Sequence, residues 1–452
     1  MITKQKGTYD VYGKKGRDVL ALRNIFEDLM TNYNYEYFRT PVFESSSLFH
    51  RGVGETTDIV SKETYDFKDR GDRDLTLRPE STAAIVRSYI ENKLYTDPNS
   101  PKKCWFFEPM YRYERPQSGR MREHFQFGVE VFGSDDPLMD AEVISIPVNF
   151  YRLLGLKGVT VHINSLGDKK TRDDYRSALV EYLTPHINEL CPDCQNRFLK
   201  NPLRIIDCKV DKDSEILKNV PSILDYQSKE AKKHFNLVLK YLDALEIPYE
   251  IDPKIVRGLD YYTNTVFEVI ADIKEFGAQN VMCAGGRYNN LVKTLDGPDV
   301  PAVGFGMGIE RLMMALDYEN IDVSGDNSIN CYIAPIGDEA KDFSLALCNT
   351  LRILGLKSDM DYLNRTLKSN FKQAERLGAK FMIIVGDEEI DTGVLTVRNM
   401  KTKTEEKVDN AMIIDYLVSE LESLEDDCCD DGCSCDDCSC DDHCSGECHC
   451  KD

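Results

Sequence analysis

The chain has 452 residues, of which 42% are hydrophobic and 30% are charged, and its formal net charge at pH 7 is −22. This length predicts two to four domains, and this composition is that of a globular protein rather than a disordered or fibrous one. No apolar run reaches the ~20 residues that span a bilayer, and residues 1–13 lack the apolar stretch of a signal peptide, so we expect a cytoplasmic protein that does not enter a membrane.

The negative charge and the cysteines are concentrated at the C-terminal end. Residues 425–452 contain eleven Asp or Glu and one Lys, a balance of −10, which leaves −12 on the preceding 424 residues. Because phosphate is contacted by local basic surfaces, this net charge does not exclude a nucleic-acid partner. Nine of the sixteen Cys follow residue 427. In a cytosolic protein they indicate thiols or metal ligands rather than disulfides.

Helical spacing in residues 16–33 predicts the first helix. The apolar side chains available for burial on it are Leu20, Ile25, Leu29 and Met30. Extended segments follow, and residues 106–133 (FFEPMYRYERPQSGRMREHFQFGVEVFG) alternate as two strands joined by a loop. Since successive strand residues point to opposite faces, Gln126, Gly128 and Glu130 share one face. We expect Gly128 to leave a gap between the two polar side chains, which makes that face a pocket floor.

The loop of this hairpin carries the guanidinium groups of Arg115, Arg120 and Arg122, and Arg112 precedes it on the same strand face as Glu114. Arginine is suited to planar, bidentate recognition of phosphate. The crowding of these arginines in one loop favours a phosphate-binding hairpin over the common alternative, a hairpin with one solvated face.

The rest of the chain predicts a discontinuous first domain and a separate last one. After a helix in residues 136–156 and a strand in 158–165, residues 169–247 are mainly helical and contain no nucleotide-binding motif. We expect them to be an insertion between two parts of one domain, residues 1–168 and 248–322. Residues 328–424 alternate β and α elements, which predicts a compact α/β domain with a mixed sheet. Residues 425–452 are expected to be a disordered tail.

A glycine-rich strand in residues 303–312 precedes a helix that carries Arg311 in its first turn. Gly306 and Gly308 permit close approach of a ligand, and the helix N-terminus adds positive potential. A dinucleotide fingerprint would need Gly at position 309, which is Ile, and the chain contains no phosphate-loop signature. The usual P-loop routes to nucleotide binding are therefore excluded.

Five segments, in order, resemble the class II aminoacyl-tRNA synthetases, specifically the histidyl enzymes. RTPVFE, from residue 39, resembles motif 1, and LRPESTA, from residue 77, resembles an amino-acid-binding loop. Residues 106–133 resemble motif 2. VRGLDYYTNTVFEV, from residue 256, resembles the histidine-specific signature, and VGFGMGIERL, from residue 303, resembles motif 3. The resemblance, which extends to about residue 420, implies an α+β fold. Its parts are a catalytic antiparallel sheet flanked by helices, a helical insertion and a C-terminal α/β anticodon-binding domain. Motif 1 implies a homodimer.

The resemblance implies that ATP, with Mg²⁺, and L-histidine form histidyl-adenylate and that the histidyl group then passes to tRNA(His). A carboxylate attacking a phosphate brings two anions together, so the site must supply positive charge. By their family positions, Arg112 would contact the α-phosphate, Arg311 the γ-phosphate, and Arg257 both the α-phosphate and the histidine carboxylate.

The resemblance also implies two sets of binding residues. Those implied for ATP are Arg112, Glu114, Phe125, Gly306, Gly308 and Arg311. Those implied for histidine are Glu80, Thr82 and Gln126 at the α-amino group, Glu130 and Tyr262 at the ring, and Arg257 and Tyr261 beside them. The family commonly has Phe-His before Gln126, whereas this chain has His124-Phe125, which leaves open which ring stacks on adenine. The family element GGRYD is GGRYNN at residues 285–290, so an acidic residue is missing.

Two groups of cysteines are candidates for metal binding. Cys191, Cys194 and Cys208 are three potential zinc ligands, but no fourth is identified, and thiols without metal are favoured. In the tail, clustered soft thiolates are ligands for zinc or Cu(I); the alternative is an acidic extension with incidental metal affinity. The tail cysteines are Cys428, Cys429, Cys433, Cys435, Cys438, Cys440, Cys444, Cys448 and Cys450.

Three further alternatives remain open from the sequence. A synthetase-like regulatory subunit of histidine biosynthesis would share the fold, but such subunits typically lack the C-terminal domain. A thiol-based metal-binding protein would account for the tail alone. Lys368, Lys372 and Arg376 recur at four-residue intervals, so they form either an ordinary solvated helix face or a contact with tRNA.

Overall fold

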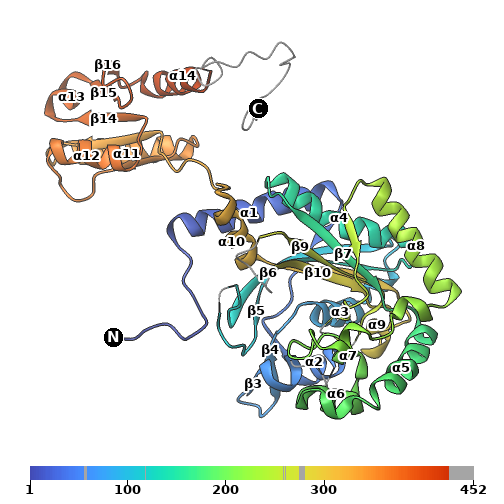
Figure 1. Cartoon of the computed structure of the whole chain (residues 1–452). Coiled ribbons are helices and arrows are strands. Elements are labelled where there is room, and N and C mark those ends of the chain that lie inside the picture. The colour runs from blue at the N-terminus through green and yellow to red at the C-terminus, as the bar shows by residue number, and fades with distance from the viewer. Residues whose placement is uncertain are drawn as a thin grey trace. The chain divides into compact units, whose positions relative to one another are not determined.

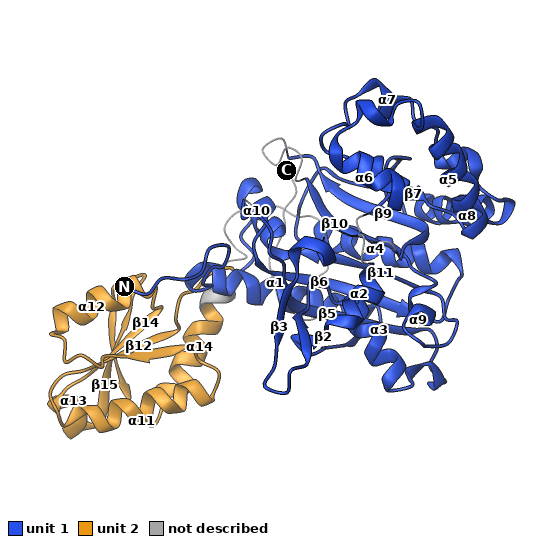
Figure 2. Cartoon of the chain, turned by 90° about the horizontal axis from the view of Figure 1, so that it is seen from below, with its two compact units in different colours: residues 1–324 blue, residues 325–452 orange. Residues whose placement is uncertain are grey.

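The computed structural model describes residues 1–54, 57, 59–117, 119–257, 259, 261–273 and 280–426. The chain divides into two compact units, Met1–Ser324 and Gly325–Asp452, which are coloured separately in Figure 2. None of the helices in the described ranges has the length and apolar content needed to cross a bilayer.

The first unit is built on a sheet in which eight described strands pair in the order β1-β5-β6-β11-β10-β9-β7-β8 (Figure 1). Their bounds are β1 Glu36–Tyr37, β5 Lys102–Tyr111, β6 Glu123–Phe132, β11 Ala302–Gly308, β10 Val281–Arg287, β9 Thr263–Ala271, β7 Val159–Ser165 and β8 Tyr249–Ile251. Neighbours run antiparallel except for the edge pairs β1/β5 and β7/β8. The antiparallel catalytic sheet predicted from the sequence is confirmed.

One face of this sheet is covered by α1 Gly13–Asn32, α4 Pro137–Leu153 and α8 Lys229–Ala244. Phe26 of α1 stacks on Phe127 of β6 with ring centroids 4.4 Å apart. Leu29 and Met30 are buried as expected, but Leu20 is 57% exposed. The inward stripe of α1 instead runs through Leu22 and Phe26, whose spacing to Leu29 and Met30 follows the helical repeat, whereas Leu20 lies off that stripe.

The start of α4 follows from its sequence. Pro137 occupies the first turn, and the side chain of Asp136 accepts a hydrogen bond from the backbone N–H of Leu138 at 2.9 Å. This cap satisfies one of the N–H groups that a helix N-terminus leaves free. In the same turn Asp140 turns inward and pairs with Arg287 of β10, which fixes α4 on the sheet.

A smaller sheet of β2 Phe43–Ser45, β4 Asp74–Leu77 and β3 Tyr65–Lys68 lies in the same unit. Next to it in the chain are α2 Ser46–Val53, the π-helix η1 Ile59–Glu63, α3 Thr82–Glu91 and the 3-10 turn η2 Leu94–Thr96. A buried ion pair between Arg78 Nη1 and Glu108 Oε1, 2.8 Å apart, joins this region to β5. The backbone N–H of Thr40 and the hydroxyl of Ser81 also donate to Glu108.

The predicted insertion is mainly helical, as expected. Its elements are α5 Lys169–Leu183, η3 Ile187–Glu189, α6 Pro192–Lys200, η4 Pro202–Ile205, α7 Glu215–Lys218, η5 Ile223–Tyr226 and α8. The apolar cluster built on Leu179 and Leu183 of α5 includes Val256, Tyr262 and Val266 from the catalytic part of the chain. The insertion therefore packs directly against the segment that leads into β9. The remaining helices of the unit are α9 Leu291–Thr294 and α10 Ile309–Glu319.

The second unit contains a five-stranded mixed sheet in the order β13-β12-β14-β15-β16. Its strands are β12 Cys331–Pro335, β13 Ser358–Met360, β14 Phe381–Val385, β15 Val394–Asn399 and β16 Glu405–Asp409; its helices are α11 Ala340–Ile353, α12 Leu367–Arg376, α13 Asp387–Thr392 and α14 Ile413–Asp426. The mixed α/β character agrees with the sequence prediction. The short elements β13 and α13 are not predicted, because a three-residue polar strand and a six-residue acidic helix have no detectable periodicity.

Candidate active site

The hairpin that the sequence singled out is formed by β5 and β6, which pair from Lys102↔Phe132 to Tyr111↔Glu123. Phe127 and Val129 of β6 are buried in the main core, so Gln126, Gly128 and Glu130 lie on the opposite face of the strand. The floor between these two polar side chains differs from the prediction. A Cβ on Gly128 would lie 2.2 Å from Cζ of Phe106, so the ring of Phe106 already fills the expected gap. The floor is aromatic rather than open.

Glu130 is the centre of a buried polar cluster. Its Oε1 accepts a hydrogen bond from Oγ1 of Thr82 at 2.6 Å, and its Oε2 accepts one from the hydroxyl of Tyr288. Gly304 pairs with Glu130 across β11 and β6, and a Cβ there would lie 1.8 Å from Oε2. Burial raises the pKa of Glu130 to about 8, while the two donors act against the shift.

Tyr288 is a site residue that sequence reasoning missed. It is 1% exposed and contacts Glu130 directly. The one sequence feature that could have indicated Tyr288 is the GGRYNN element at residues 285–290. This element is a family feature, but the sequence alone assigns no role to it. A Tyr at the end of a strand is equally typical of a core residue, so only the three-dimensional structure distinguishes the two.

Glu80 lies at the start of α3, next to this cluster. Its carboxylate accepts hydrogen bonds from the backbone N–H groups of Thr82, at 2.8 Å, and Ala83, at 2.9 Å. Burial raises the pKa of Glu80, while these donors act against the shift. The carboxylate is therefore oriented by the first turn of the helix, as in a helix cap.

Tyr261 and Tyr262 complete the cluster. Their ring centroids are 4.7 Å apart, and the ring of Tyr261 lies 5.6 Å from that of Tyr288. Burial, followed by the charges of neighbouring groups that include Glu80 and Glu130, raises the pKa of Tyr261. The structure thus brings together five of the residues predicted for histidine, Glu80, Thr82, Glu130, Tyr261 and Tyr262, with Tyr288 beside them. Gln126 lies further along β6, with its amide oxygen 3.4 Å from the position of a Cβ on Gly306.

Arg257 adopts a strained backbone conformation beside the tyrosines. Its φ angle is +54°, a region that side chains other than glycine rarely occupy. Its Nη1 forms an ion pair with Oε1 of Glu268 at 2.7 Å, and its guanidinium group lies 5.6 Å from the ring centroid of Tyr262. Its Nε is shielded from solvent and has no hydrogen-bond partner among the described residues. An oriented donor is therefore free to bind an anion.

Arg112 and Arg311 come from different elements and flank the loop of the hairpin. Arg112 follows the end of β5 and donates from Nε to the carbonyl of Pro79 at 2.8 Å. Arg311, in the first turn of α10, donates from Nη1 to the carbonyl of Val281 at 2.6 Å. Burial and the charge of Arg120 lower the pKa of Arg311, whereas the charges of Glu114 and Glu268 act to raise it.

Glu114 lies between Arg112 and Arg120. Its Oε2 lies 3.2 Å from Nη1 of Arg120 and its Oε1 lies 3.8 Å from Nη1 of Arg112. The positive charges of Arg112, Arg120 and Arg311 suit a polyanion such as a chain of phosphates. The carboxylates of Glu114 and Glu268 beside them suit a cation bound to that polyanion, since Mg²⁺ prefers carboxylate and phosphate oxygens. At Gly308, the last residue of β11, a Cβ would meet no described atom within 4 Å, so the approach to these groups is open at that glycine.

The sequence left open whether His124 or Phe125 stacks on adenine, and the structure places the two side chains on opposite faces of β6. Phe125 packs on Phe107 at a centroid distance of 5.4 Å and belongs to the border of the main core. His124 instead shares the strand face of Gln126 and Glu130. Burial and the charges of Arg112 and Arg311 lower the pKa of His124 to about 3, so the ring is neutral, and its Nδ1 has no partner among the described residues.

A cavity of about 350 Å³ adjoins the cluster, between α2, the segment that precedes β9 and the insertion. Arg257, Tyr261 and Tyr262 line it from the catalytic side, and Asn201, Leu203 and Arg204 line it from the insertion. The insertion thus contributes to the walls beside the candidate site. The nine tail cysteines, Cys428 to Cys450, lie outside the described residues.

Comparison with known proteins gives a consistent result. A family model described as histidyl-tRNA synthetase matches residues 7–312, and one described as anticodon binding domain matches residues 330–420. A histidine–tRNA ligase of Geobacillus sp. (strain WCH70) is 48% identical over 416 residues, which cover 92% of this chain and 98% of that protein. One of Staphylococcus aureus (strain JH9) is 47% identical over 417 residues, covering 92% and 99%.

Among solved structures, apo histidyl-tRNA synthetase of S. aureus matches with a TM-score of 0.80 at 41% identity, covering 92% of this chain and 100% of that one. A Bacillus halodurans C structure named as an ATP phosphoribosyltransferase regulatory subunit/histidyl-tRNA synthetase matches with a TM-score of 0.60 at 21% identity, covering 85% of this chain and 98% of that one, which shows the fold alone. The family, fold and enzyme class predicted from the sequence are confirmed, and the regulatory alternative is not favoured. The chain belongs to the histidyl-tRNA synthetase family of class II aminoacyl-tRNA synthetases.

Proposed function

We propose that this chain ligates L-histidine to tRNA(His) for protein biosynthesis, by forming histidyl-adenylate from ATP and histidine and then transferring the histidyl group to the tRNA. The observation that carries this proposal is one contiguous site in which Glu130, held by Thr82 and Tyr288, lies beside the tyrosine pair and Arg257. A buried, hydrogen-bonded carboxyl suits an imidazole N–H, and a free guanidinium donor suits a carboxylate or phosphate.

In the proposed activation step, Arg257 binds the histidine carboxylate and the α-phosphate of ATP. Arg112 binds the α-phosphate from the other side, and Arg311 binds the γ-phosphate. Their positive charges offset the repulsion between the two anions as the carboxylate attacks, and pyrophosphate leaves. Mg²⁺ bound to ATP would neutralise charge on the phosphates, and the carboxylate of Glu268 would contact the ion or its water ligands.

The amino acid is selected by a cage of hydrogen-bonding groups. We assign Glu130 and Tyr262 to the imidazole ring, Tyr261 to the wall beside it, and Tyr288 to the positioning of Glu130. The α-amino group would be held by Glu80, Thr82 and Gln126. An analogue without ring nitrogens would leave Glu130 without its ligand hydrogen bond, and such sites discriminate by about 10⁴-fold or more.

For the adenosine end we assign the stacking role to His124 rather than Phe125, since His124 is neutral and faces the arginines. Glu114 lies towards the adenine end, and Gly306 and Gly308 leave room for the nucleoside.

The other proposed features concern domains and partners. The catalytic domain comprises residues 1–168 and 248–322, the insertion 169–247 and the anticodon-binding domain 328–424. The exposed residues Lys368, Lys372 and Arg376 of α12 are proposed to contact tRNA phosphates. A homodimer is proposed through the motif 1 region, where Phe43 and Phe67 form an exposed aromatic pair. We place the enzyme in the cytoplasm.

The proposed activity is tested by ATP–pyrophosphate exchange with each of the standard amino acids in turn. Exchange is expected with histidine alone, followed by charging of tRNA(His) when the tRNA is added. Exchange that does not depend on histidine, or its absence with every amino acid, would exclude the proposed function.

Glu130→Ala is expected to raise the KM for histidine far more than the KM for ATP. The lost charged hydrogen bond contributes about 1.5–3 kcal/mol, which corresponds to roughly a 10- to 150-fold change. Pyrophosphate exchange at varied histidine and varied ATP separates the two constants. Glu91→Ala, which removes an exposed carboxylate from α3, is the control and should change neither. An unchanged KM for histidine together with lost ATP affinity would show that the two pockets are assigned backwards.

Removal of the tail after Leu424 is expected to leave aminoacylation of tRNA(His) about unchanged, since every assigned site residue precedes that point and an acidic tail repels tRNA. We propose that the tail binds zinc or copper through its nine thiols, with release as the pH falls and the thiolates are protonated. Elemental analysis of both proteins, purified without chelator, measures the difference. Equal metal contents would exclude the tail as a binding site, and a large loss of aminoacylation would make it part of the enzyme.

A further inference from the structure

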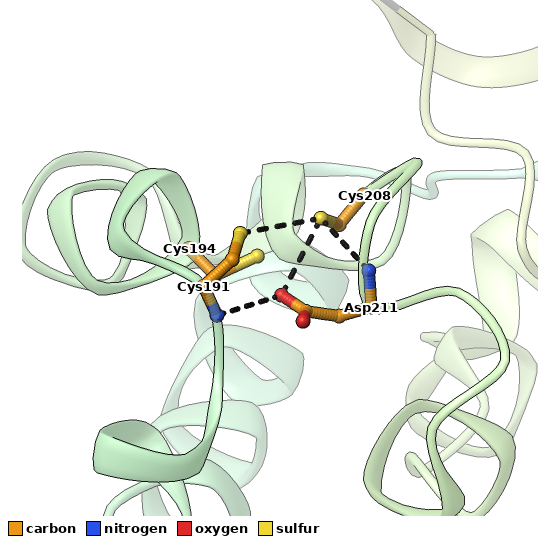
Figure 3. A group of neighbouring side chains, drawn as sticks. All are labelled: Cys191, Cys194, Cys208 and Asp211. Carbon is orange, nitrogen blue, oxygen red and sulfur yellow. Dashed lines mark hydrogen bonds between the residues drawn. The ribbon is translucent and has the colours of Figure 1, made fainter.

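Three thiols and one carboxylate meet inside the insertion, away from the residues assigned to catalysis. The ligand atoms of Cys191, Cys194, Cys208 and Asp211 all lie within 4.8 Å of one another. Figure 3 shows the four side chains pointing towards a common centre. We propose that these residues bind one zinc ion in a tetrahedral site of three thiolates and one carboxylate, and that this ion holds the insertion in shape.

The distances fit a tetrahedron around zinc. Sγ of Cys191 and Sγ of Cys208 are 3.7 Å apart. Two Zn–S bonds of about 2.3 Å at the tetrahedral angle place their sulfurs about 3.8 Å apart. Sγ of Cys208 and Oδ2 of Asp211 are 3.5 Å apart. A Zn–S bond of about 2.3 Å and a Zn–O bond of about 2.1 Å place these atoms about 3.6 Å apart. The two edges of the tetrahedron that these distances measure therefore have the length that zinc requires, and the other ligand atoms lie within 4.8 Å of one another.

The ligands are oriented before any ion binds. The backbone N–H of Asp211 donates to Sγ of Cys208 at 3.4 Å, and the backbone N–H of Cys191 donates to Oδ2 of Asp211 at 3.0 Å. Donors of this kind fix the direction of a ligand and stabilise its anionic form. Cys194 is 0% exposed and Cys208 is 3% exposed, so water has little access to these two sulfurs, while Cys191 and Asp211 are partly buried. Soft thiolates in a closed four-ligand site select zinc over Mg²⁺ or Ca²⁺, which require six or more oxygens.

A disulfide explains the cluster less well. The 3.7 Å between Cys191 and Cys208 is far beyond the S–S bond length of about 2.05 Å. One disulfide would also leave the third thiol and the carboxylate of Asp211 without a bound group that explains their position. Asp211 is the fourth ligand that the sequence did not identify; its Cys208-x-x-Asp211 spacing repeats that of Cys191-x-x-Cys194.

The position of the cluster gives the ion a structural consequence. Cys191 caps α6 and Cys194 lies in its first turn, while Cys208 and Asp211 follow η4. The ion would therefore link both ends of the segment that contains Asn201, Leu203 and Arg204, the residues that line the cavity opposite Arg257 and Tyr262. Loss of the ion should loosen that wall without removing any group assigned to the reaction.

The test uses the full-length chain in a background where the nine tail cysteines are replaced by Ser, so that only the insertion can hold zinc through clustered thiols. Purified without chelator, this protein is expected to contain one zinc per chain by elemental analysis. X-ray absorption at the zinc edge should show three sulfur ligands and one oxygen ligand. Cobalt in place of zinc should give the absorption bands of a tetrahedral thiolate site.

Variants in the same background separate the possible outcomes. Cys208→Ser and Asp211→Ala should each lose most of the zinc, whereas Asp211→Cys should retain it because a fourth thiolate replaces the carboxylate. Cys348→Ser, which alters a buried thiol in the second unit, is the matched control and should retain the full amount. Amide hydrogen exchange in α6 should rise in the two variants that lose zinc and in no other. A background protein without zinc, zinc content that is independent of Cys208, or an intact mass two hydrogens short from a disulfide would each overturn the proposal.

Discussion

Replacing Arg257 with Ala is expected to reduce histidine-dependent ATP–pyrophosphate exchange by about 10²–10³-fold while the protein remains folded. The side chain is already held by Glu268, and its Nε is directed away from any described partner, so its geometry does not need to be assembled during the reaction. Its charge is needed most when the carboxylate approaches the α-phosphate, which makes kcat the more sensitive constant.

Two further variants make this test specific. Arg257→Lys should recover little activity, since a point charge does not reproduce two directed donors. Arg73→Ala removes an exposed arginine that is also paired with a carboxylate and should leave exchange unchanged. Circular dichroism of each protein checks the fold. Near-normal exchange by a folded Arg257→Ala protein would remove this residue from the mechanism.

Asp140→Ala is expected to lower the free energy of unfolding of the first unit by about 3–5 kcal/mol, because it leaves the charge of Arg287 buried without its carboxylate partner. Both side chains are 0% exposed, and Nη2 of Arg287 lies 2.6 Å from Oδ2 of Asp140. The only tryptophan in the chain, Trp105 on β5, reports urea unfolding of this unit by fluorescence. A loss below about 1 kcal/mol would mean that water or a rearranged neighbour satisfies Arg287.

The pH dependence of this pair has a defined sign. Burial acts to raise the pKa of Asp140, but the charges and hydrogen bonds of Arg287 and His234 together hold the pKa below its usual value. A carboxyl with a lowered folded-state pKa stabilises the protein above the unfolded value of about 3.9 and loses that contribution as the pH falls through the folded value. The stability difference between wild type and Asp140→Ala should therefore shrink only in strongly acidic buffer. The exposed pair Lys170–Asp174 is the control, since Asp174→Ala should cost less than about 0.5 kcal/mol.

The sequence predicted best the elements, and the neighbouring residues, that lie in segments with a distinct motif or a strong periodicity. The hairpin of β5 and β6, the helical insertion and the mixed sheet of the second unit follow from alternation and helical spacing. Glu80, Thr82, Glu130, Tyr261 and Tyr262 were found because each lies in a family motif, and the structure brings them together.

The sequence predictions failed for side chains whose surroundings are formed by residues from other segments of the chain. The exposure of Leu20 depends on which side of α1 faces the sheet, and the filling of the gap at Gly128 depends on Phe106 from the neighbouring strand. Tyr288 gains its place in the site from a hydrogen bond to a residue 158 positions away. Asp211 becomes a candidate metal ligand only because a chain reversal returns it to Cys191.

The glycine opposite Glu130 has a consequence for any change of substrate. Gly304 has no side chain, and the carboxyl of Glu130 occupies the space that one would fill. The depth of the proposed amino-acid pocket is therefore set jointly by β6 and by the neighbouring β11. A smaller residue at position 130 would leave a void against bare backbone, and a larger residue at position 304 would push the carboxyl out. Enzymes selected to charge a different amino acid through this pocket should thus acquire substitutions at both positions, in pairs.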